Sequence, residues 1–362
     1  MRFVLSLFLV VCASVCMEAQ SICKVFGFPS TEPGYSLGVS ACYAGRIGDY
    51  MVMAGGCNFA TPGNKTYYRG IYAARIDADV LAWHLVGWLP KAAAYGGCVQ
   101  SGDSLVFIGG CNADGAMSSV LSVRLTPDGG RAVVNQLASL PRTVDNMAVA
   151  CSHDVVYVVG GNQNGSPSAD MMALQLDNGE CGVISTLPGC PRVQPVAAAV
   201  DGMVYVWGGF YADGNRSVVH TDGCVYDAEC GQWQSVAAPV TDEKGTKKAT
   251  TLSGAVAIVV GDKIVCVGGV NHDIFLDAIS GDYRLVAKDD YLSQPVSWYK
   301  FNPVCWTYHT KRLLWTVEAD DALLARAGAQ LVLAGKNVYC IGGELKPAVR
   351  TPIIVRLAAP MP

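Results

Sequence analysis

Short apolar segments with strand character recur along nearly the whole chain, and six of them end in a pair of glycines. A stretch of small, apolar residues precedes each of these segments, and one or two further strand-like segments follow it. The 3.6-residue periodicity of amphipathic helices is nearly absent. The pattern therefore predicts six copies of one β-structured repeat. The glycine pairs end at Gly56, Gly110, Gly161, Gly209, Gly269 and Gly343.

The repeat length favours one architecture. The glycine pairs recur roughly every 50 residues, and about four strands in a repeat of that length is typical of kelch propellers. We therefore expect an all-β fold, a six-bladed kelch β-propeller over residues 20–362. The last repeat lacks an outermost strand after the stretch 351–357. The stretch 22–28 can fill that place, so we expect an N-terminal strand to complete the last blade and close the ring.

The N-terminus has the pattern of a secretory signal peptide. Arg2 precedes the apolar run 3–11, and small residues then lead to a cleavage site near Ala19. The run is too short to span a bilayer. We therefore expect residues 1–19 to be removed, and the mature protein to be soluble, without membrane insertion, in a Gram-negative periplasm.

Composition narrows the class of ligand. Charged residues make up only 15% of the chain and the net charge is −4, so no basic field favours nucleic acid or an anionic membrane. The chain has 15 cysteines, none in a Cys-x-x-Cys pair. Many lie within apolar strands, so we expect them to be small, buried hydrophobic residues. The disulfide pairing and the oligomeric state, monomer or homodimer, stay open.

Propeller geometry predicts which residues meet at the end of the central channel. In an antiparallel blade, the second strand ends on the face where the innermost strand begins. Residues just after each glycine pair and residues just before each innermost strand therefore share one mouth. Four blades carry a cation before the innermost strand, in the same phase along the chain. We expect a ring of cations and an anionic ligand, with solvated rim charges as the alternative; the four are Lys91, Arg142, Arg192 and Arg326.

One acidic residue is distinctive among the loops after the glycine pairs. Glu344 is the only carboxylate that directly follows a pair, and Lys346 and Arg350 come soon after it. Two cations so near favour the ionised form of a carboxyl group. We therefore expect Glu344 to be a general base at rest, with a purely structural ion pair as the alternative.

Three segments resemble a known family. Segment 342–351 reads GGELKPAVRT and is similar to the GEAKPGLRT signature of bacterial N-acetylneuraminate mutarotases, or sialic acid epimerases, which are six-bladed kelch propellers. Segments 268–275, GGVNHDIF, and 191–194, PRVQ, resemble that family's GGVNQNIF and PRDQ. The order of the repeats differs, so the chain resembles a cyclically permuted branch of the family, which a closed ring tolerates.

The resemblance implies a mutarotase that interconverts the α and β anomers of N-acetylneuraminate in support of sialic acid uptake. Ring opening and closure need a base at the anomeric hydroxyl and an acid at the ring oxygen, but no cofactor and no metal. By resemblance, Glu344 accepts and donates the proton, and Arg350 binds the substrate carboxylate, for which a guanidinium is suited. Further candidate substrate contacts are Arg192, Asn271, Arg142, Lys346 and Arg326.

The chain departs from the family in segment 57–70, which reads CNFATPGNKTYYRG. Asn58, Lys65 and Arg69 therefore receive no role from the resemblance, and His272 replaces an amide of the family. The exact sugar acid accordingly stays open.

Other functions remain as alternatives. The main one is a non-catalytic kelch propeller that binds an acidic sugar or a protein partner. A copper oxidase on a propeller needs clustered His and Tyr ligands, whereas the five histidines are scattered over different repeats. A sialidase would carry Asp-box turns, which the sequence lacks. Because a fold alone does not decide function, the Glu344 and Arg350 pair carries the distinction.

Overall fold

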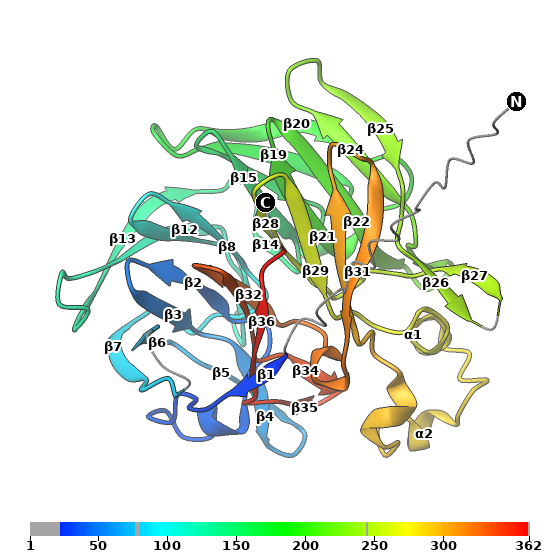
Figure 1. The fold of residues 1–362 in the computed structure, drawn as a ribbon, viewed down its shortest axis with the longest axis horizontal. Helices are drawn as coiled ribbons and strands as arrows, with labels where there is room; N and C mark the ends of the chain where they lie inside the picture. Colours follow the sequence, from blue (N-terminus) through cyan, green and yellow to red (C-terminus); the bar gives the residue numbers. More distant parts are fainter. Residues whose placement is uncertain (1–21, 77–79, 244, 361–362) are drawn as a thin grey trace, which may run out of the picture.

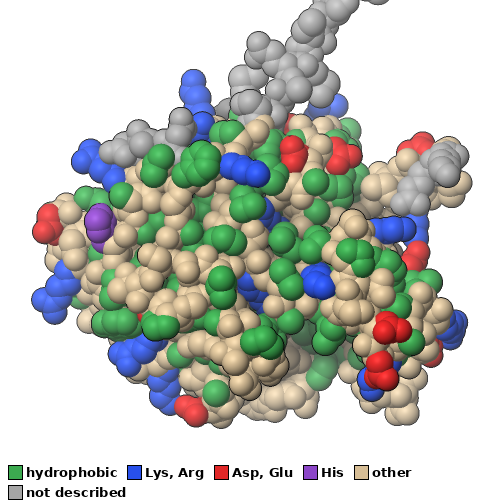
Figure 2. Space-filling view, turned by 90° about the horizontal axis from the view of Figure 1, so that it is seen from below, with side chains coloured by type: hydrophobic (Ala, Val, Ile, Leu, Met, Phe, Trp, Pro, Cys, Tyr) green, Lys and Arg blue, Asp and Glu red, His purple; other side chains and the backbone are tan. Residues whose placement is uncertain are grey.

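The computed structural model describes residues 22–76, 80–243 and 245–360, and the predicted signal peptide at 1–19 lies outside them. Five four-stranded antiparallel sheets and one five-stranded sheet, six blades in all, surround a central channel (Figure 1). The predicted six-bladed propeller is therefore confirmed. In the described part of the chain, no helix is long and apolar enough to cross a membrane. On the face seen in Figure 2, Lys and Arg side chains are interspersed with Asp and Glu, without a large basic patch.

The blades are numbered along the chain, and each is given from its innermost strand outward. Blade I contains β2 (Tyr43–Ile47), β3 (Tyr50–Ala54), β6 (Gly70–Arg75) and β7 (His84–Trp88). Blade II contains β8 (Gly97–Ser101), β9 (Ser104–Ile108), β12 (Ser119–Leu125) and β13 (Ala132–Ser139). Blade III contains β15 (Ala148–Ser152), β16 (Val155–Val159), β19 (Asp170–Gln175) and β20 (Cys181–Thr186).

The second half of the ring follows the same order. Blade IV contains β21 (Val193–Val200), β22 (Met203–Ala212), β24 (Gly223–Asp227) and β25 (Gln232–Val236), with β23 (Ser217–Val219) added to β22. Blade V contains β28 (Val256–Val260), β29 (Lys263–Val267), β30 (Val304–His309) and β31 (Leu314–Asp320). Blade VI contains β32 (Gln330–Ala334), β33 (Asn337–Ile341), β36 (Ile354–Ala358) and β1 (Cys23–Val25).

Short elements connect the blade strands. The hairpins are β4 (Cys57–Thr61) with β5 (Asn64–Tyr67), β10 (Cys111–Asn112) with β11 (Gly115–Ala116), β17 (Asn162–Gln163) with β14 (Val144–Asp145) and β18 (Ser166–Pro167), β26 (Val240–Glu243) with β27 (Thr246–Ala249), and β34 (Glu344–Lys346) with β35 (Val349–Arg350). The helical segments are α1 (His272–Ile279), α2 (Lys288–Tyr291) and the 3-10 turns η1 (Tyr35–Leu37), η2 (Val296–Tyr299) and η3 (Ala322–Leu324).

The hydrophobic core is divided among the blade interfaces. Six buried clusters each combine side chains of two neighbouring blades. The second strand of each blade is apolar on both faces, as in β9, where every residue from Ser104 to Ile108 is buried. Such strands are covered on both sides, which explains why their hydrophobic runs are continuous rather than alternating.

The N-terminal strand closes the ring as the sequence predicts. In blade VI, β1 pairs antiparallel with β36, with Cys23 opposite Arg356 and Val25 opposite Ile354. The first strand of the described chain therefore completes the blade formed by its last strands (Figure 1).

A second closure is made by backbone hydrogen bonds around the channel. In each blade, one residue at or just before the start of the innermost strand has positive φ, and its N–H donates to the carbonyl of the equivalent residue in the preceding blade. The six bonds measure 2.7 to 3.1 Å and form a closed circle. This circle fixes the backbone at the mouth of the channel before any side chain acts. Its members, named below as the mouth ring, are Ala41, Tyr95, Asn146, Gln194, Gly254 and Gly328.

Candidate active site

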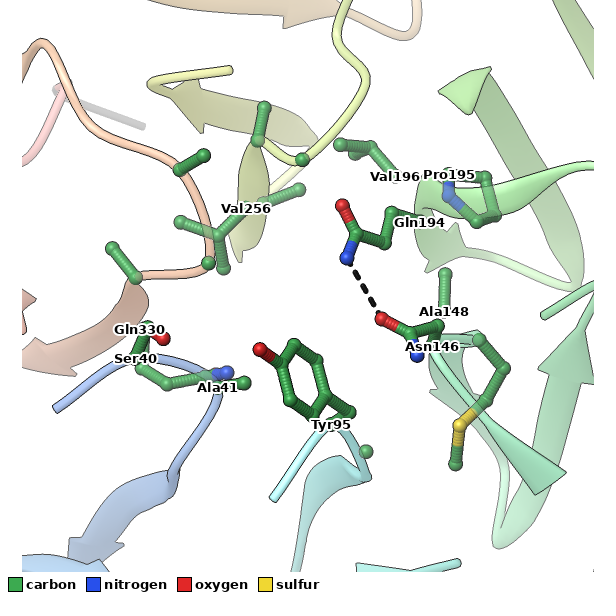
Figure 3. A pocket seen from close by; sticks show the side chains of 18 of the residues that line it. Ser40, Ala41, Tyr95, Asn146, Ala148, Gln194, Pro195, Val196, Val256 and Gln330 are labelled. Atoms are coloured by element: carbon green, nitrogen blue, oxygen red, sulfur yellow. Dashed lines mark hydrogen bonds between the residues drawn. The ribbon is translucent and has the colours of Figure 1, made fainter. Parts of the chain in front are cut away.

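All six blades contribute to a cavity of about 370 Å³ at the mouth ring. The Gln194 amide donates a hydrogen bond to the Asn146 side-chain oxygen at 2.7 Å, and Figure 3 shows this pair and Tyr95 projecting into the cavity. Amides and hydroxyls spread over a concave site suit a small ligand with several hydroxyl groups. The polar lining is Ser40, Tyr95, Asn146, Gln194, Gln330 and Glu344.

The residues after the glycine pairs lie at this same mouth, as predicted from propeller geometry. Each of them hydrogen-bonds through its backbone to the residue just before the mouth ring of its own blade. Glu344 thereby pairs with Ala327, with N···O distances of 2.7 and 2.9 Å. Of these residues after the glycine pairs, only Glu344 is a carboxylate. The set is Cys57, Cys111, Asn162, Phe210, Val270 and Glu344.

Glu344 and Arg350 are opposite each other in the hairpin β34–β35, and their side chains form an ion pair. The Glu344 side chain is 24% exposed and lines the cavity, whereas the Arg350 side chain is only 3% exposed. The Arg350 guanidinium lies 5.1 Å from the Phe59 ring centroid, and its Nε has no hydrogen-bond partner among the described residues. The pair therefore presents an accessible carboxylate in front of a buried cation, and Arg350 itself does not line the cavity.

Burial dominates the titration of Glu344. Desolvation raises the pKa of its carboxyl group above the ordinary value, while the charges of Arg350 and then Lys65 lower it. Neighbouring cations alone predict an ionised carboxyl group, but burial outweighs their effect on the pKa of Glu344. A carboxyl group whose pKa is raised toward neutrality can both accept and donate a proton in the accessible pH range.

The second cation beside Glu344 is Lys65, which the sequence analysis left without a role. It lies on the hairpin β4–β5 of blade I. Its ammonium is 5.0 Å from the Tyr95 ring centroid and 5.7 Å from that of Phe59, and 3.5 Å from the Tyr95 hydroxyl. The Phe59 ring therefore contacts both cations, Lys65 and Arg350. The sequence feature that could have pointed to Lys65 is the departure of segment 57–70, which contains this hairpin, from the family sequence.

The predicted ring of cations is wrong for Arg192 and Arg326. Both side chains are about 1% exposed, and neither lines the cavity. Arg192 donates to the carbonyl of Gly208 and to the Asp222 carboxylate. Arg326 donates to the carbonyl of Gly342 and to two further backbone carbonyls. These guanidiniums satisfy buried backbone oxygens instead of facing a ligand.

The same need is met in every blade, by different side chains. The carbonyl of the first glycine of each pair accepts a hydrogen bond from a side-chain donor. This regularity explains why arginines recur at one position without forming a binding site. The donors are Tyr35, Tyr43, Gln163, Arg192, Asn302 and Arg326, in the order of blades I to VI.

Arg142 and Lys91 also differ from the prediction. Arg142 forms an ion pair with Asp170 at 2.6 Å and donates to Gln163, so it supports the glycine carbonyl contact of blade III indirectly. Lys91 is exposed before β8, and it does not line the cavity. The alternative interpretation, a solvated rim charge, fits Lys91, whereas Arg142 is held by contacts within blade III.

Asn271 and Lys346 have structural contacts beside the cavity. The Asn271 side-chain oxygen accepts from the N–H groups of Asp273 and Ile274 and caps α1, a common role for asparagine at a helix start. The Lys346 ammonium donates to the carbonyls of Leu292 and Gln294 at 3.0 and 2.7 Å. The Lys346 side chain therefore connects the α2–η2 segment of blade V to the hairpin β34–β35, and it points away from Glu344.

The described residues form neither a metal-ligand cluster nor a disulfide. Within the described ranges, no three His, Cys, Asp or Glu side chains are grouped to hold a metal ion. All 13 cysteines from Cys23 to Cys340 are free. Several are buried in strands, as expected for small hydrophobic residues, and burial raises the pKa of the Cys42 thiol to about 12.

Comparison with known proteins points to one family. The family model described as N-acetylneuraminate epimerase matches residues 137–359. The chain is 29% identical over 231 residues to the N-acetylneuraminate epimerase of Pasteurella multocida (strain Pm70), covering 61% of this chain and 58% of that protein. It is 30% identical over 222 residues to the protein of the same name from Haemophilus influenzae (strain PittEE), covering 59% and 56%. The chain thus matches less than two thirds of the length of these relatives.

A solved structure supports the fold independently. The structure titled "Structure of YjhT" matches with a TM-score of 0.51 at 24% identity, covering 60% of this chain and 65% of that one.

Proposed function

The chain belongs to the N-acetylneuraminate epimerase family, and on that basis we propose that it is a mutarotase, an isomerase that interconverts the α and β anomers of N-acetylneuraminate. The names of the family model and of the curated relatives support this substrate. The observation that carries the proposal is the accessible carboxylate of Glu344 in the cavity lining, paired with the buried guanidinium of Arg350.

Each member of the pair has a task in the proposed reaction. N-acetylneuraminate bears a carboxylate and a hydroxyl on its anomeric carbon. Arg350 binds the substrate carboxylate through the guanidinium that Glu344 contacts in the free protein, which places the anomeric hydroxyl beside Glu344. Glu344 removes the hydroxyl proton, the bond from the anomeric carbon to the ring oxygen breaks, and an open-chain ketone forms. Rotation about the adjacent carbon–carbon bond and closure on the other carbonyl face give the opposite anomer.

The cellular setting is a further part of the proposal. The predicted signal peptide at 1–19 supports export to a periplasm, where the enzyme would supply the required anomer for sialic acid uptake. Whether the enzyme works as a monomer or as a homodimer does not alter the chemistry, because the cavity is built from the six blades of one chain.

Proton NMR tests the proposal. A sialidase that releases N-acetylneuraminate as one anomer starts the reaction away from equilibrium, and the H3 signals of the two anomers are resolved. We expect catalytic amounts of the protein to accelerate equilibration without changing the final anomer ratio. Equilibration at the buffer rate would contradict the proposal, and saturable binding without acceleration would support the alternative, a non-catalytic sugar-binding propeller.

A further inference from the structure

Resting on the proposed function, we propose that Tyr95 is the second proton-transfer group of the site, and that Lys65 stabilises its deprotonated form. Ring opening places a negative charge on the departing ring oxygen while Glu344 takes the anomeric proton. The reaction therefore benefits from a second group that donates a proton to the ring oxygen.

The backbone holds Tyr95 in place in the cavity wall. Tyr95 is a member of the mouth ring with φ of +59°, a conformation that is uncommon for a bulky residue. Its N–H donates to the carbonyl of Ala41 at 2.9 Å, and its carbonyl accepts from the N–H of Asn146 at 2.8 Å. The side chain projects into the cavity (Figure 3). Unusual backbone conformations that persist because neighbours fix them are common at functional sites.

Few of the side chains that line the cavity can transfer a proton to or from the sugar. Glu344 supplies the carboxylate, and the phenol of Tyr95 is the other ionisable oxygen acid in the lining. Burial and then the neighbouring Cys57 thiol raise the pKa of Tyr95, and smaller effects come from the charge of Arg350, which lowers it, and that of Glu344, which raises it. Both groups, Glu344 and Tyr95, therefore face the same cavity.

Lys65 is positioned for the charge that would develop on Tyr95. Its ammonium lies 3.5 Å from the phenol oxygen and 5.0 Å from the ring centroid. An ammonium at this distance from a tyrosinate stabilises the anion, more strongly so in a site from which the substrate displaces water. Lys65 lies in segment 57–70, which departs from the family sequence, so its place beside Tyr95 comes from the structure and not from the resemblance.

The proton steps balance. On opening, Glu344 gains the anomeric proton, the O–H electron pair becomes the carbonyl π bond, and the ring carbon–oxygen pair moves to the ring oxygen. That oxygen takes the proton of Tyr95, which becomes a tyrosinate beside Lys65. On closure each proton returns. Burial raises the pKa of Tyr95, so the phenol is protonated at rest, and an alkoxide is basic enough to take its proton.

Tyr95→Phe removes the hydroxyl and keeps the ring, and Tyr211→Phe is the matched control. Tyr211 lies at the same mouth on β22, and its hydroxyl donates to Asp213 instead of facing the cavity. In the anomer-equilibration assay we expect Tyr95→Phe to lower kcat by about 10²-fold to 10⁴-fold, with KM within about threefold of wild type. Tyr211→Phe should retain the wild-type rate.

A double-mutant cycle separates the chemical role from a structural one. Measured at a pH well above the acid limb, where Glu344 is ionised in every variant, Lys65→Met should lower kcat in the wild-type background but have no further effect in Tyr95→Phe, because no tyrosinate forms there. If wild type accelerates equilibration and Tyr95→Phe does so equally well, Tyr95 is not a proton donor. If Tyr95→Phe fails to fold, an unchanged kcat in folded Lys65→Met overturns the proposal. If wild type itself shows no acceleration, the mutarotase function fails and this inference falls with it.

Discussion

The Glu344 carboxylate and the Arg350 guanidinium are paired across the hairpin β34–β35, with the carboxylate toward the cavity and the guanidinium buried behind it. A buried cation needs a counter-charge, and in the free protein Glu344 provides it. In the proposed reaction, a substrate carboxylate takes over that contact and releases Glu344 toward the anomeric hydroxyl. The ion pair would then link binding of an acid to the availability of the base.

Arg350→Lys keeps the charge and removes the planar pair of donors. Hydrogen bonds to charged groups contribute about 1.5–3 kcal/mol, so we expect affinity for N-acetylneuraminate to fall by about 10- to 100-fold. The uncharged methyl ester of the sugar should bind both proteins equally. Calorimetric titration of acid and ester measures the difference, and an equal loss for both ligands would show that Arg350 does not recognise the carboxylate.

The acid limb of the pH profile reports on Glu344. Burial raises its pKa, and the base must be ionised, so kcat/KM should fall at a pH above that of an ordinary glutamate, about 4.3. The charge of Lys65 lowers this pKa, so Lys65→Met should move the acid limb to still higher pH. Lys346→Met, which removes an ammonium bound to loop carbonyls, should leave the midpoint in place. A limb that stays fixed in Lys65→Met would contradict the assignment.

Arg326 is expected to act on stability. Its guanidinium satisfies the carbonyls of Leu323, Gly342 and Ile353, and each unsatisfied buried acceptor costs about 1–3 kcal/mol. Arg326→Met should therefore lower the free energy of unfolding by about 3 kcal/mol or more in urea denaturation. Arg142→Met, at a side chain that is 37% exposed, should cost no more than about 1 kcal/mol. A stable Arg326→Met protein with weakened sugar binding would restore the predicted ring of cations.

Gly342 is required by the approach of the next blade. Its φ is +62°, and a Cβ there would lie 2.4 Å from the carbonyl oxygen of Val39. Gly48 has a similar φ of +56° but open space around it. Gly48→Ala should cost about 1–2 kcal/mol from the left-handed conformation alone, and Gly342→Ala should cost distinctly more and also lower activity, since Glu344 follows closely. Equal losses of stability would show that the contact between blades is unimportant.

The sequence predicted the closed ring of six blades and the position of Glu344 at the mouth of the channel. The glycine pairs gave six blades, and the spare N-terminal strand gave the closure that β1 makes with β36. Both predictions succeeded because the repeat imposes the same constraint six times. The position of Glu344 after its glycine pair placed it at the mouth for the same reason.

The prediction of a ring of cations was wrong because a cation at this position of the repeat can either face a ligand or satisfy a backbone carbonyl. Arg192 and Arg326 occupy equivalent positions in their repeats, but there each guanidinium donates to a glycine carbonyl. Other blades meet that need with residues at other positions, such as Tyr35 and Asn302, so no shared residue type revealed it. Lys65 was missed because its place beside Tyr95 depends on how the hairpin β4–β5 folds toward the cavity, a tertiary contact without a periodic signal.

The most direct test of the account is anomer equilibration measured by proton NMR with wild type and with Glu344→Gln at equal concentration. Glutamine keeps the shape of the side chain but cannot take the anomeric proton. We predict rapid equilibration by wild type, and a loss of about 10²-fold to 10⁴-fold in Glu344→Gln with circular dichroism and melting temperature showing an intact fold. A folded Glu344→Gln protein that equilibrates the anomers as fast as wild type would contradict the central claim that Glu344 is the catalytic base.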